Sequence, residues 1–458
     1  MERTIAAIAT APGEAGIGIV RISGDRSIEI LEKVFKPKKN INITEIPSRT
    51  VTYGHAVDEN GRVLDEVLVI IMKRPYSYTT EDVVEIHCHG GIIPVKRIME
   101  QVLKNGAYLA EPGEFTKRAF LNGRIDLAQA EAVIDVITSK TESGLNAALN
   151  QLEGELSVEI KKIMEKLLSM LAHIEASIDF PEHDIEEVTL NRITDMLKDA
   201  EKAIVSLIDT FGEGKIIRDG LSTAIIGRPN VGKSSLLNVL LKENRAIVTE
   251  VPGTTRDIIE EYLSIGGVLV RLIDTAGIRE TEDVVEKIGV QRTKEAINRA
   301  ELIVLVIDAS KELQHEDKAI ISLVEGKRVI VALNKIDLGI KCDRSSLERM
   351  FGSGSLIEMS VKNKLGIDKL EEYINNMVFQ GKLSIKKNML VTNIRHKDLL
   401  DKARESIKRA LESLKGGIPV DLVSVDIKDA WNNLGAITGD TVEEDIINEI
   451  FSKFCIGK

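Results

Sequence analysis

One glycine-rich segment, residues 227–235, constrains the fold of this chain more than any other feature. It reads Gly-Arg-Pro-Asn-Val-Gly-Lys-Ser-Ser, follows an apolar run at 223–226 and precedes apolar residues at helical spacing in 236–241. A strand, a loop of this pattern and a helix, in that order, are typical of a P-loop. Backbone N–H groups of such a loop, with the positive end of the helix dipole, bind polyphosphate. The pattern predicts a nucleotide site in which Lys233 reaches the β- and γ-phosphates and Ser234 binds Mg²⁺.

Strands and helices alternate through the region from residue 220 to about 380. This alternation predicts a doubly wound α/β domain, whose ligands lie at the carboxyl ends of the strands. The predicted strands are 223–226, 261–265, 268–274, 302–308, 329–333 and 356–359.

Four further motifs occur in a fixed order along the same region, at 253–257, 274–277, 334–337 and 360–362. Asp274 is expected to hold Mg²⁺ through water, and Thr255 lies where a switch loop supplies a Mg²⁺ ligand. The carboxylate of Asp337 can accept two hydrogen bonds from guanine that adenine cannot donate, which selects GTP over ATP. With the P-loop, these motifs predict a GTP-binding domain. The predicted GTP contacts are Asn230, Val231, Gly232, Lys233, Ser234, Ser235, Thr249, Glu250, Val251, Pro252, Gly253, Thr254, Thr255, Asp274, Thr275, Ala276, Gly277, Asn334, Lys335, Asp337, Ser360, Val361 and Lys362.

The residue that follows the Asp274–Gly277 motif is Ile278. Many small GTPases carry at that position a glutamine that orients the attacking water. An isoleucine can neither donate nor accept a hydrogen bond, so hydrolysis here requires another water-orienting group and another positive charge. Candidates in the sequence are Arg256, Arg279, Glu280, Glu282 and Glu286.

The regions on either side of the nucleotide domain differ in their predicted secondary structure. Residues 1–118 read as mixed α/β, with strands at 5–10, 19–23, 51–55, 66–72 and 82–87, a glycine-rich turn at 13–18 and a helix at 93–104. The stretch 128–179 is helix-forming, and further helices are predicted at 190–210, 393–415, 421–434 and 442–454. The simplest organisation is one helical domain, 119–219 and 381–458, interrupted by a nucleotide domain at 220–380. The amphipathic faces fit either a helical bundle or a homodimeric coiled coil.

Composition restricts the remaining possibilities. The 458 residues carry a net charge of −11, which does not suit a protein that coats nucleic acid, although one basic face is compatible with it. The three cysteines are widely separated, which favours a reducing compartment over a disulfide framework. No apolar run is long enough to span a bilayer, so we expect a cytoplasmic protein with no membrane partner.

Several segments together resemble the bacterial tRNA-modification GTPase family MnmE (also TrmE). In the nucleotide domain they are the P-loop sequence, Gly-Thr-Thr-Arg-Asp and Asp-Thr-Ala-Gly-Ile-Arg-Glu. Outside it they are Ala-Thr-Ala-Pro-Gly, Arg21-Ile-Ser-Gly, Glu-Asp-Val-Val-Glu85-Ile-His-Cys-His-Gly-Gly, the segment 112–129 and the terminal Cys455-Ile-Gly-Lys458. The resemblance therefore spans the whole chain.

The resemblance implies an N-terminal domain, 1–118, that binds a tetrahydrofolate derivative (the 5-formyl or methylene form) and forms a homodimer. It further implies K⁺-dependent GTP hydrolysis, with Ser234 and Thr255 on Mg²⁺. The K⁺ ligands would be Asn230, Thr249, Val251 and Thr254. The ion would replace an arginine finger. Glu286 would orient the water, and with Lys233 it makes up the implied catalytic pair.

The resemblance also implies a folate site and partners. Arg21, Arg124 and Lys458 match cationic folate contacts, and Glu85 matches a carboxylate that accepts from the pterin ring. A subunit carrying FAD (MnmG/GidA-like) and the tRNA would be the partners, and the product a carboxymethylaminomethyl or aminomethyl group on a wobble uridine. Cys455 is a possible modification-site residue, although an inert terminal cysteine fits equally well. Two alternatives remain: an RNA-binding ribosome-assembly switch, and a folate-dependent transferase regulated by its GTPase domain.

Overall fold

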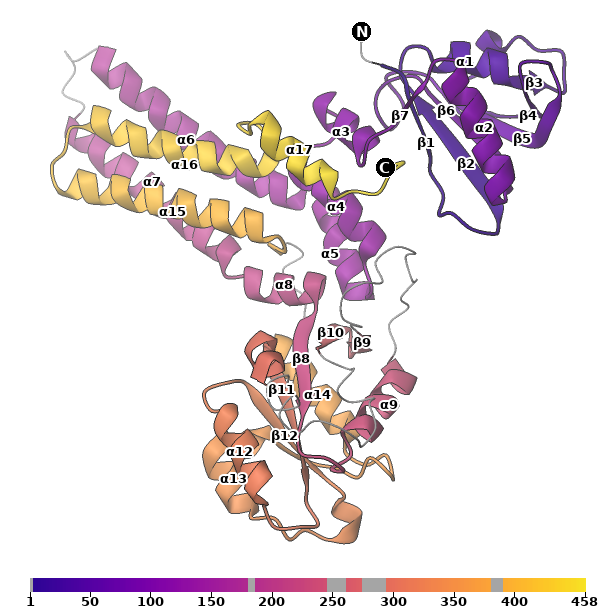
Figure 1. The fold of residues 1–458 in the computed structure, drawn as a ribbon. Helices are drawn as coiled ribbons and strands as arrows, with labels where there is room; N and C mark the ends of the chain where they lie inside the picture. Colours follow the sequence, from indigo (N-terminus) through magenta and orange to yellow (C-terminus); the bar gives the residue numbers. More distant parts are fainter. Residues whose placement is uncertain (1–2, 180–185, 245–260, 274–293, 380–389) are drawn as a thin grey trace. The chain divides into compact units, whose positions relative to one another are not determined.

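The computed structural model describes residues 3–179, 186–244, 261–273, 294–379 and 390–458 (Figure 1). The chain divides into two compact units. Unit 1 comprises Met1–Ile134, Leu152–Glu175 and Ile427–Lys458, and unit 2 comprises Asp135–Gln151 and Ala176–Asp426. Each unit is thus assembled from segments that are far apart in the sequence. The four-segment division predicted from the sequence remains a prediction.

Unit 1 contains a seven-stranded sheet in the order β3-β4-β5-β6-β2-β1-β7. All its described pairings are antiparallel except that of β1 with β7. Helices α1 and α2 bury one face, where Leu31 and Ile98 join Ile22 and Ile86 in one hydrophobic core. The opposite face, here called the polar face, carries Arg21 and Glu85 and also exposed apolar side chains such as Leu68. It is the face on which a site can form. The elements are β1 (Ile5–Ile8), β2 (Ala15–Ser23), α1 (Ser27–Val34), β3 (Phe35–Pro37), β4 (Val51–Val57), β5 (Val63–Met72), β6 (Val83–Gly90), α2 (Ile92–Lys104) and β7 (Tyr108–Leu109).

The predicted turn at 13–18 is wrong for most of its length. Strand β2 begins at Ala15, which pairs with Gly90 of β6, and the register shifts between Ala15 and Gly18. A Cβ atom at Gly90 would collide with the carbonyl of Ala15. These glycines therefore permit close packing of two strands rather than a change of direction.

The helix-forming stretch 128–179 contains three helices rather than one. The break after α5 contains Gly154, whose φ of +91° is a left-handed conformation that favours glycine. In unit 1, Leu127 and Ala130 pack with Phe451 of the C-terminal helix. The remaining helices before the nucleotide domain and after it are α3 (Glu114–Leu121), α4 (Leu127–Thr138), α5 (Glu142–Leu152), α6 (Glu155–Asp179), α7 (Glu186–Ile208), α8 (Phe211–Asp219), α15 (Ile394–Lys415), α16 (Val420–Thr438) and α17 (Glu444–Ser452).

The nucleotide domain lies within unit 2 and has a six-stranded sheet in the order β13-β12-β11-β8-β10-β9. Only β9, at one edge, pairs antiparallel. Separate hydrophobic clusters cover the two faces, one with α9 and α14 and the other with α12 and α13. The predicted doubly wound sheet is confirmed. Its elements are β8 (Leu221–Ile226), α9 (Lys233–Asn244), β9 (Glu261–Ile265), β10 (Val268–Leu272), β11 (Leu302–Asp308), α12 (His315–Leu323), β12 (Val329–Asn334), α13 (Arg344–Phe351), β13 (Leu356–Glu358) and α14 (Ile367–Phe379).

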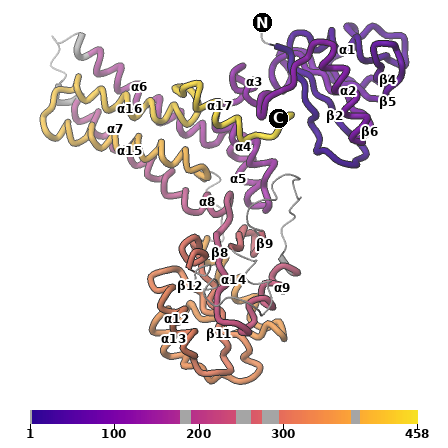
Figure 2. The backbone as a smooth tube through the Cα atoms, viewed as in Figure 1, coloured from indigo at the N-terminus to yellow at the C-terminus, as the bar shows by residue number. Residues whose placement is uncertain are grey.

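Helices from both sides of the nucleotide domain lie together. In Figure 2 the tube of α15 runs alongside that of α7, and the two helices are in contact. Leu197 and Ile204 of α7 are buried, as are Leu400 and Ile407 of α15. The predicted discontinuous helical domain is therefore confirmed.

Candidate nucleotide and folate sites

The P-loop lies between the carboxyl end of β8 and the first turn of α9. Strand β8 is buried at every residue, so the loop leaves the sheet from a fixed point. Asn230 has φ of +63° and Gly232 has φ of +104°. A Cβ atom at Gly232 would collide with the amide of Asn334. These left-handed turns let successive N–H groups line a concave loop, as phosphate binding requires.

Lys233 is oriented by the loop itself. Its Nζ donates to the carbonyl oxygens of Gly227 and Arg228, each at 2.8 Å. Burial lowers the pKa of the Lys233 ammonium. The side chain therefore extends along the loop on the side where the phosphates would bind, and Ser234 and Ser235 follow it in the first turn of α9.

The predicted base-reading motif lies against the P-loop. Asn334, at the end of β12, donates from Nδ2 to the carbonyl of Val231 at 2.8 Å. Its Oδ1 accepts from the backbone N–H of Val361 at 3.1 Å. Asp337 accepts a hydrogen bond from the hydroxyl of Ser360 at 2.7 Å. The structure thus brings three motifs that are far apart in the sequence to one edge of the sheet.

Lys335 ties the same edge to a neighbouring strand. Its Nζ donates to the carbonyl of Asn230 and to the carboxylate of Asp308, each at 2.8 Å. Burial opposes ionisation of Asp308, but hydrogen bonds from Lys335 and Ser310 hold the pKa of Asp308 below its usual value. Lys362, by contrast, is exposed. The contribution of Asp308 was not predicted from the sequence, because nothing in its spacing marks it.

Some predicted site residues lie outside the described residues. They are Thr249, Glu250, Val251, Pro252, Gly253, Thr254, Thr255, Asp274, Thr275, Ala276, Gly277 and Glu286. Ile278 and the other candidates for orienting water are among the same segments.

The second site lies on the polar face of the unit 1 sheet. Arg21 of β2 pairs in register with Glu85 of β6, and their side chains form an ion pair at 2.9 Å. The other carboxylate oxygen of Glu85 lies 3.2 Å from Nε2 of His87. The guanidinium of Arg21 also lies over the ring of Phe115, 5.7 Å from its centroid. Two of the predicted folate contacts are therefore adjacent, and His87 is an additional member that the sequence did not indicate.

The C-terminal tail lies against this cluster. Arg21 donates from Nη1 to the carbonyl of Gly457 at 3.2 Å, and the N–H of Gly113 donates to the carbonyl of Cys455 at 3.3 Å. Gly457 has φ of +90°, and a Cβ atom there would lie 2.5 Å from the carbonyl oxygen of Ile8. The side chain of Cys455 is exposed beside these contacts. The tail therefore places the backbone of Gly457, which precedes Lys458, against Arg21, and the backbone of Cys455 against Gly113.

Arg124, the remaining predicted folate contact, lies against Tyr78. Its Nη1 donates to the carbonyl of Tyr78 at 2.7 Å, and its guanidinium lies 4.7 Å from the centre of the tyrosine ring. The hydroxyl of Tyr78 bonds with that of Thr116 at 2.9 Å. Arg124 is therefore held beside an aromatic ring that packs with Phe115, the same residue that lies beneath Arg21.

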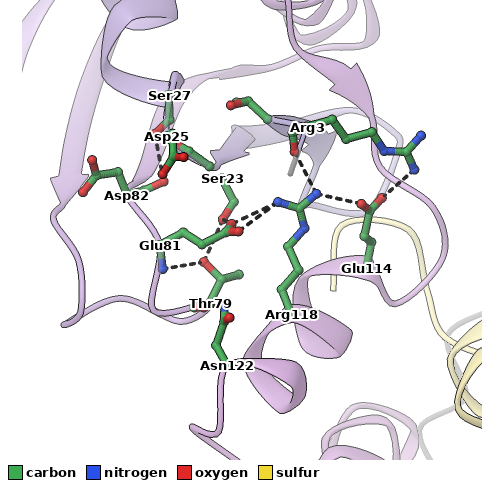
Figure 3. A network of polar contacts seen from close by, with 12 residues as sticks. Arg3, Ser23, Asp25, Ser27, Thr79, Glu81, Asp82, Glu114, Arg118 and Asn122 are labelled. Atoms are coloured by element: carbon green, nitrogen blue, oxygen red, sulfur yellow. Dashed lines mark hydrogen bonds and ion pairs between the residues drawn. The ribbon is translucent and has the colours of Figure 1, made fainter. Parts of the chain in front are cut away.

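A buried polar network fixes the loop that carries Tyr78 (Figure 3). Arg118, 6% exposed, bonds to Glu81 at 3.0 Å and to Glu114 at 2.9 Å. Glu81 accepts from Ser23 at 2.6 Å, and Asn122 donates to the carbonyl of Thr79 at 2.7 Å. Buried charges of this kind are tolerated when they are paired and hydrogen-bonded. The network joins the loop before β6 to α3, and it was not predicted from the sequence.

Comparisons with known proteins cover both sites. The family model described as the GTP-binding protein TrmE N-terminus matches residues 4–124, and the family model described as the MnmE helical domain matches residues 127–455. The tRNA modification GTPase MnmE of Alkaliphilus oremlandii is 56% identical over 459 residues, covering 100% of both chains. That of Alkaliphilus metalliredigens is 54% identical over the same length and coverage. Among solved structures, the G domain of the T. maritima FeoB iron transporter is 27% identical, with a TM-score of 0.25, and covers 34% of this chain and 97% of that one.

Proposed function

The chain belongs to the MnmE family of tRNA modification GTPases, and on that premise we propose that it uses GTP hydrolysis to drive modification of a wobble uridine in certain tRNAs. A partner subunit carrying FAD would supply the redox chemistry, and a tetrahydrofolate derivative would supply a carbon. Hydrolysis would open and close the catalytic assembly rather than perform the alkylation.

The observation that carries this proposal is the Arg21–Glu85–Gly457 cluster, in a chain that also holds a GTP-binding edge. A nucleotide switch needs no second polar site on the face of its N-terminal sheet. Glu85 offers a carboxylate suited to the N–H donors of a pterin ring, and Arg21 offers a guanidinium suited to the carboxylates of a glutamate tail. Lys458 and Arg124 would extend the cationic side of the site.

The P-loop suits the two cations that we assign to it. Ser234 follows Lys233 at the start of α9, where its hydroxyl would hold Mg²⁺ together with Thr255. Asn230 is in the left-handed conformation and its carbonyl is already engaged by Lys335, so its side-chain amide oxygen is the atom suited to K⁺. K⁺ and Mg²⁺ would stabilise the negative charge that develops on the phosphates during hydrolysis, and Glu286 would orient the attacking water.

An open sheet face supports the proposed homodimer. Tyr53 of β4 and Leu68 of β5 lie opposite each other in register and are 43% and 44% exposed. Ile17 of β2 and Val51 of β4 are each 60% exposed. Exposed apolar side chains on one domain mark association sites when they gather on a face.

In the part of the chain that is described, no helix is long and apolar enough to cross a membrane, and we propose a cytoplasmic location.

Reconstitution with tRNA tests the proposed function. The purified chain, the FAD-containing subunit, GTP, Mg²⁺, K⁺ and a tetrahydrofolate donor should convert the wobble uridine, as measured by nucleoside mass spectrometry. Omitting the folate, or using Arg21→Gln, should abolish the product while GTP hydrolysis continues. Hydrolysis without any modified nucleoside in the complete mixture would instead indicate an RNA-binding switch.

The proposed K⁺ ligation has a separate test. Replacing K⁺ by Na⁺ should slow GTP turnover about tenfold or more, because the smaller Na⁺ fits the same oxygen ligands poorly. The transition state then loses a preorganised positive charge, which costs about 1.4 kcal/mol or more. Nucleotide affinity should change little, since the P-loop contacts remain. Steady-state hydrolysis and binding of a fluorescent GDP in both salts provide the measurement. Equal rates would reject the K⁺ assignment.

A further inference from the structure

Two basic side chains, one in the P-loop and one beside it, each pair with a buried aspartate. Lys335 pairs with Asp308 at 2.8 Å, and Arg228 pairs with Asp317 at 3.2 Å. Each aspartate side chain is only 3% exposed. The first pair belongs to the base-reading motif. The second, between the loop and α12, has no part in the function proposed above.

Asp317 is held in place independently of Arg228. It is the third residue of α12, and its Oδ2 accepts from the backbone N–H of Gln314 at 3.0 Å. The contact caps the amino end of the helix. Ile321 of the same helix packs into the hydrophobic cluster on that face of the sheet. The carboxylate therefore sits on a rigid element, to which the loop can be fastened.

Arg228 connects this carboxylate to the phosphate-binding lysine. Its guanidinium is 17% exposed and faces Asp317, while its backbone carbonyl accepts from Nζ of Lys233. Three other contacts hold the loop: Lys233 to Gly227, Asn334 to Val231 and Lys335 to Asn230. The Arg228–Asp317 pair anchors the loop at its second residue.

We propose that Asp317 is a positioning residue for GTP, which holds Arg228 and through it the carbonyl that orients Lys233. Asp317 would act through Arg228 rather than by contacting the nucleotide. Its removal would leave a buried guanidinium without its carboxylate, and the loop would shift to solvate it. The nucleotide would then lose contacts to its phosphates, whereas the guanine contacts of Asp337 would remain.

The test uses the full-length chain with Asp317→Asn, which can still cap the helix because an amide oxygen also accepts from Gln314. We expect release of a fluorescent GDP to accelerate roughly tenfold, equivalent to about 1.4 kcal/mol, and GTP turnover to fall as well, because Lys233 would lose its orientation toward the β- and γ-phosphates. Glu316→Gln is the matched control, because Glu316 is an acidic, exposed residue in the same helical turn. It should release GDP at the wild-type rate.

Arg228 variants distinguish positioning from a general loss of stability. Arg228→Gln should release GDP as fast as Asp317→Asn does, and Arg228→Lys should release it more slowly than Arg228→Gln because it keeps the charge. The double variant Arg228→Gln/Asp317→Asn should release GDP no faster than the faster of the two single variants. The thermal midpoint of Asp317→Asn should stay close to that of Glu316→Gln. Wild-type GDP release from Asp317→Asn, or effects that multiply in the double variant, would overturn the proposal. If Asp317→Asn does not fold, the two Arg228 variants decide: GDP release that is slower from Arg228→Lys than from Arg228→Gln supports the proposal, and equal rates overturn it.

Discussion

The two sheets of this protein place their functional side chains by different rules. In the nucleotide domain, β8, β11, β12 and β13 run parallel, so the residues that follow them meet at one edge. In the N-terminal sheet, Arg21 and Glu85 lie within antiparallel strands and meet because the register sets them opposite each other. In the first site, four hydrogen bonds to backbone carbonyls hold the P-loop. The second depends on a chain terminus that must dock against it.

Loss of Lys233 should separate the two sites most strongly. Lys233→Ala removes the ammonium that we expect to contact the phosphates, so GTP hydrolysis should fall on the order of a hundredfold or more. Folate binding should not change, because the polar face of the other sheet is built from different strands. Hydrolysis assays and equilibrium dialysis with a 5-formyl folate provide the measurements.

The matched control for that variant is Lys242→Ala. Lys242 lies in the same helix, is exposed and makes no contact with the loop carbonyls that hold Lys233. It should leave both activities intact. Reduced folate binding in Lys233→Ala, but not in Lys242→Ala, would show that the two regions are not independent.

Gly457→Ala should impair folate binding and leave GTP hydrolysis unchanged, the reverse of Lys233→Ala. Alanine there has to adopt a φ of +90° and approach the carbonyl of Ile8, which costs about 1–3 kcal/mol. The tail should therefore leave the sheet, with weaker folate binding, slower tRNA modification and unchanged GTP hydrolysis. Hydrogen exchange of residues 455–458 would report the release. Gly16→Ala is the control, since Gly16 is in the same sheet and has open space around it. Equal exchange in both variants would contradict the docked tail.

Much of the nucleotide domain could be predicted from the sequence. Parallel strands with a motif at each carboxyl end require only that the strands be recognised, and Asn334 and Val231 then meet as the topology dictates. The clusters around Arg21 and Arg118 could not be derived in this way. Their members come from strands, a loop and a tail separated by up to 436 positions, and only the register brings them together. Arg21 and Glu85 were identified by resemblance alone, and His87, Asp308 and Asp317 were missed.

The three cysteines should differ in their rates of alkylation, because Cys455 in the C-terminal tail is exposed whereas Cys88 and Cys342 are buried. Burial, with the nearby charge of Asp65, raises the pKa of the Cys88 thiol to about 11, and burial raises that of Cys342. At pH 8 iodoacetamide should modify the exposed Cys455 first, and Cys88 about a hundredfold more slowly, because so little of it is thiolate. Peptide mass spectrometry over time measures both. Alkylation of Cys88 as fast as that of Cys455 would contradict the described core.

The smallest expected effect concerns His89. A hydrogen bond from the ring to Asp65 at 2.6 Å, and the charge of that carboxylate, raise the pKa of His89. The pair therefore stabilises the fold fully at a pH below the ordinary histidine pKa, and this stabilisation is lost as the pH rises through the raised value. Since the imidazole is 68% exposed, His89→Gln should lower the thermal midpoint by only about one degree at pH 5.5 and by less at pH 9. An equal decrease at both values would exclude the charge as the cause.

The proposed function requires two independent sites on one chain, one for GTP and one for folate. The most direct measurement is equilibrium dialysis of a 5-formyl tetrahydrofolate against the full-length protein, compared with Arg21→Gln and Lys233→Ala. We predict saturable binding to the wild type that is lost in Arg21→Gln and kept in Lys233→Ala. Absence of binding to the wild type, or equal binding to Arg21→Gln, would contradict it.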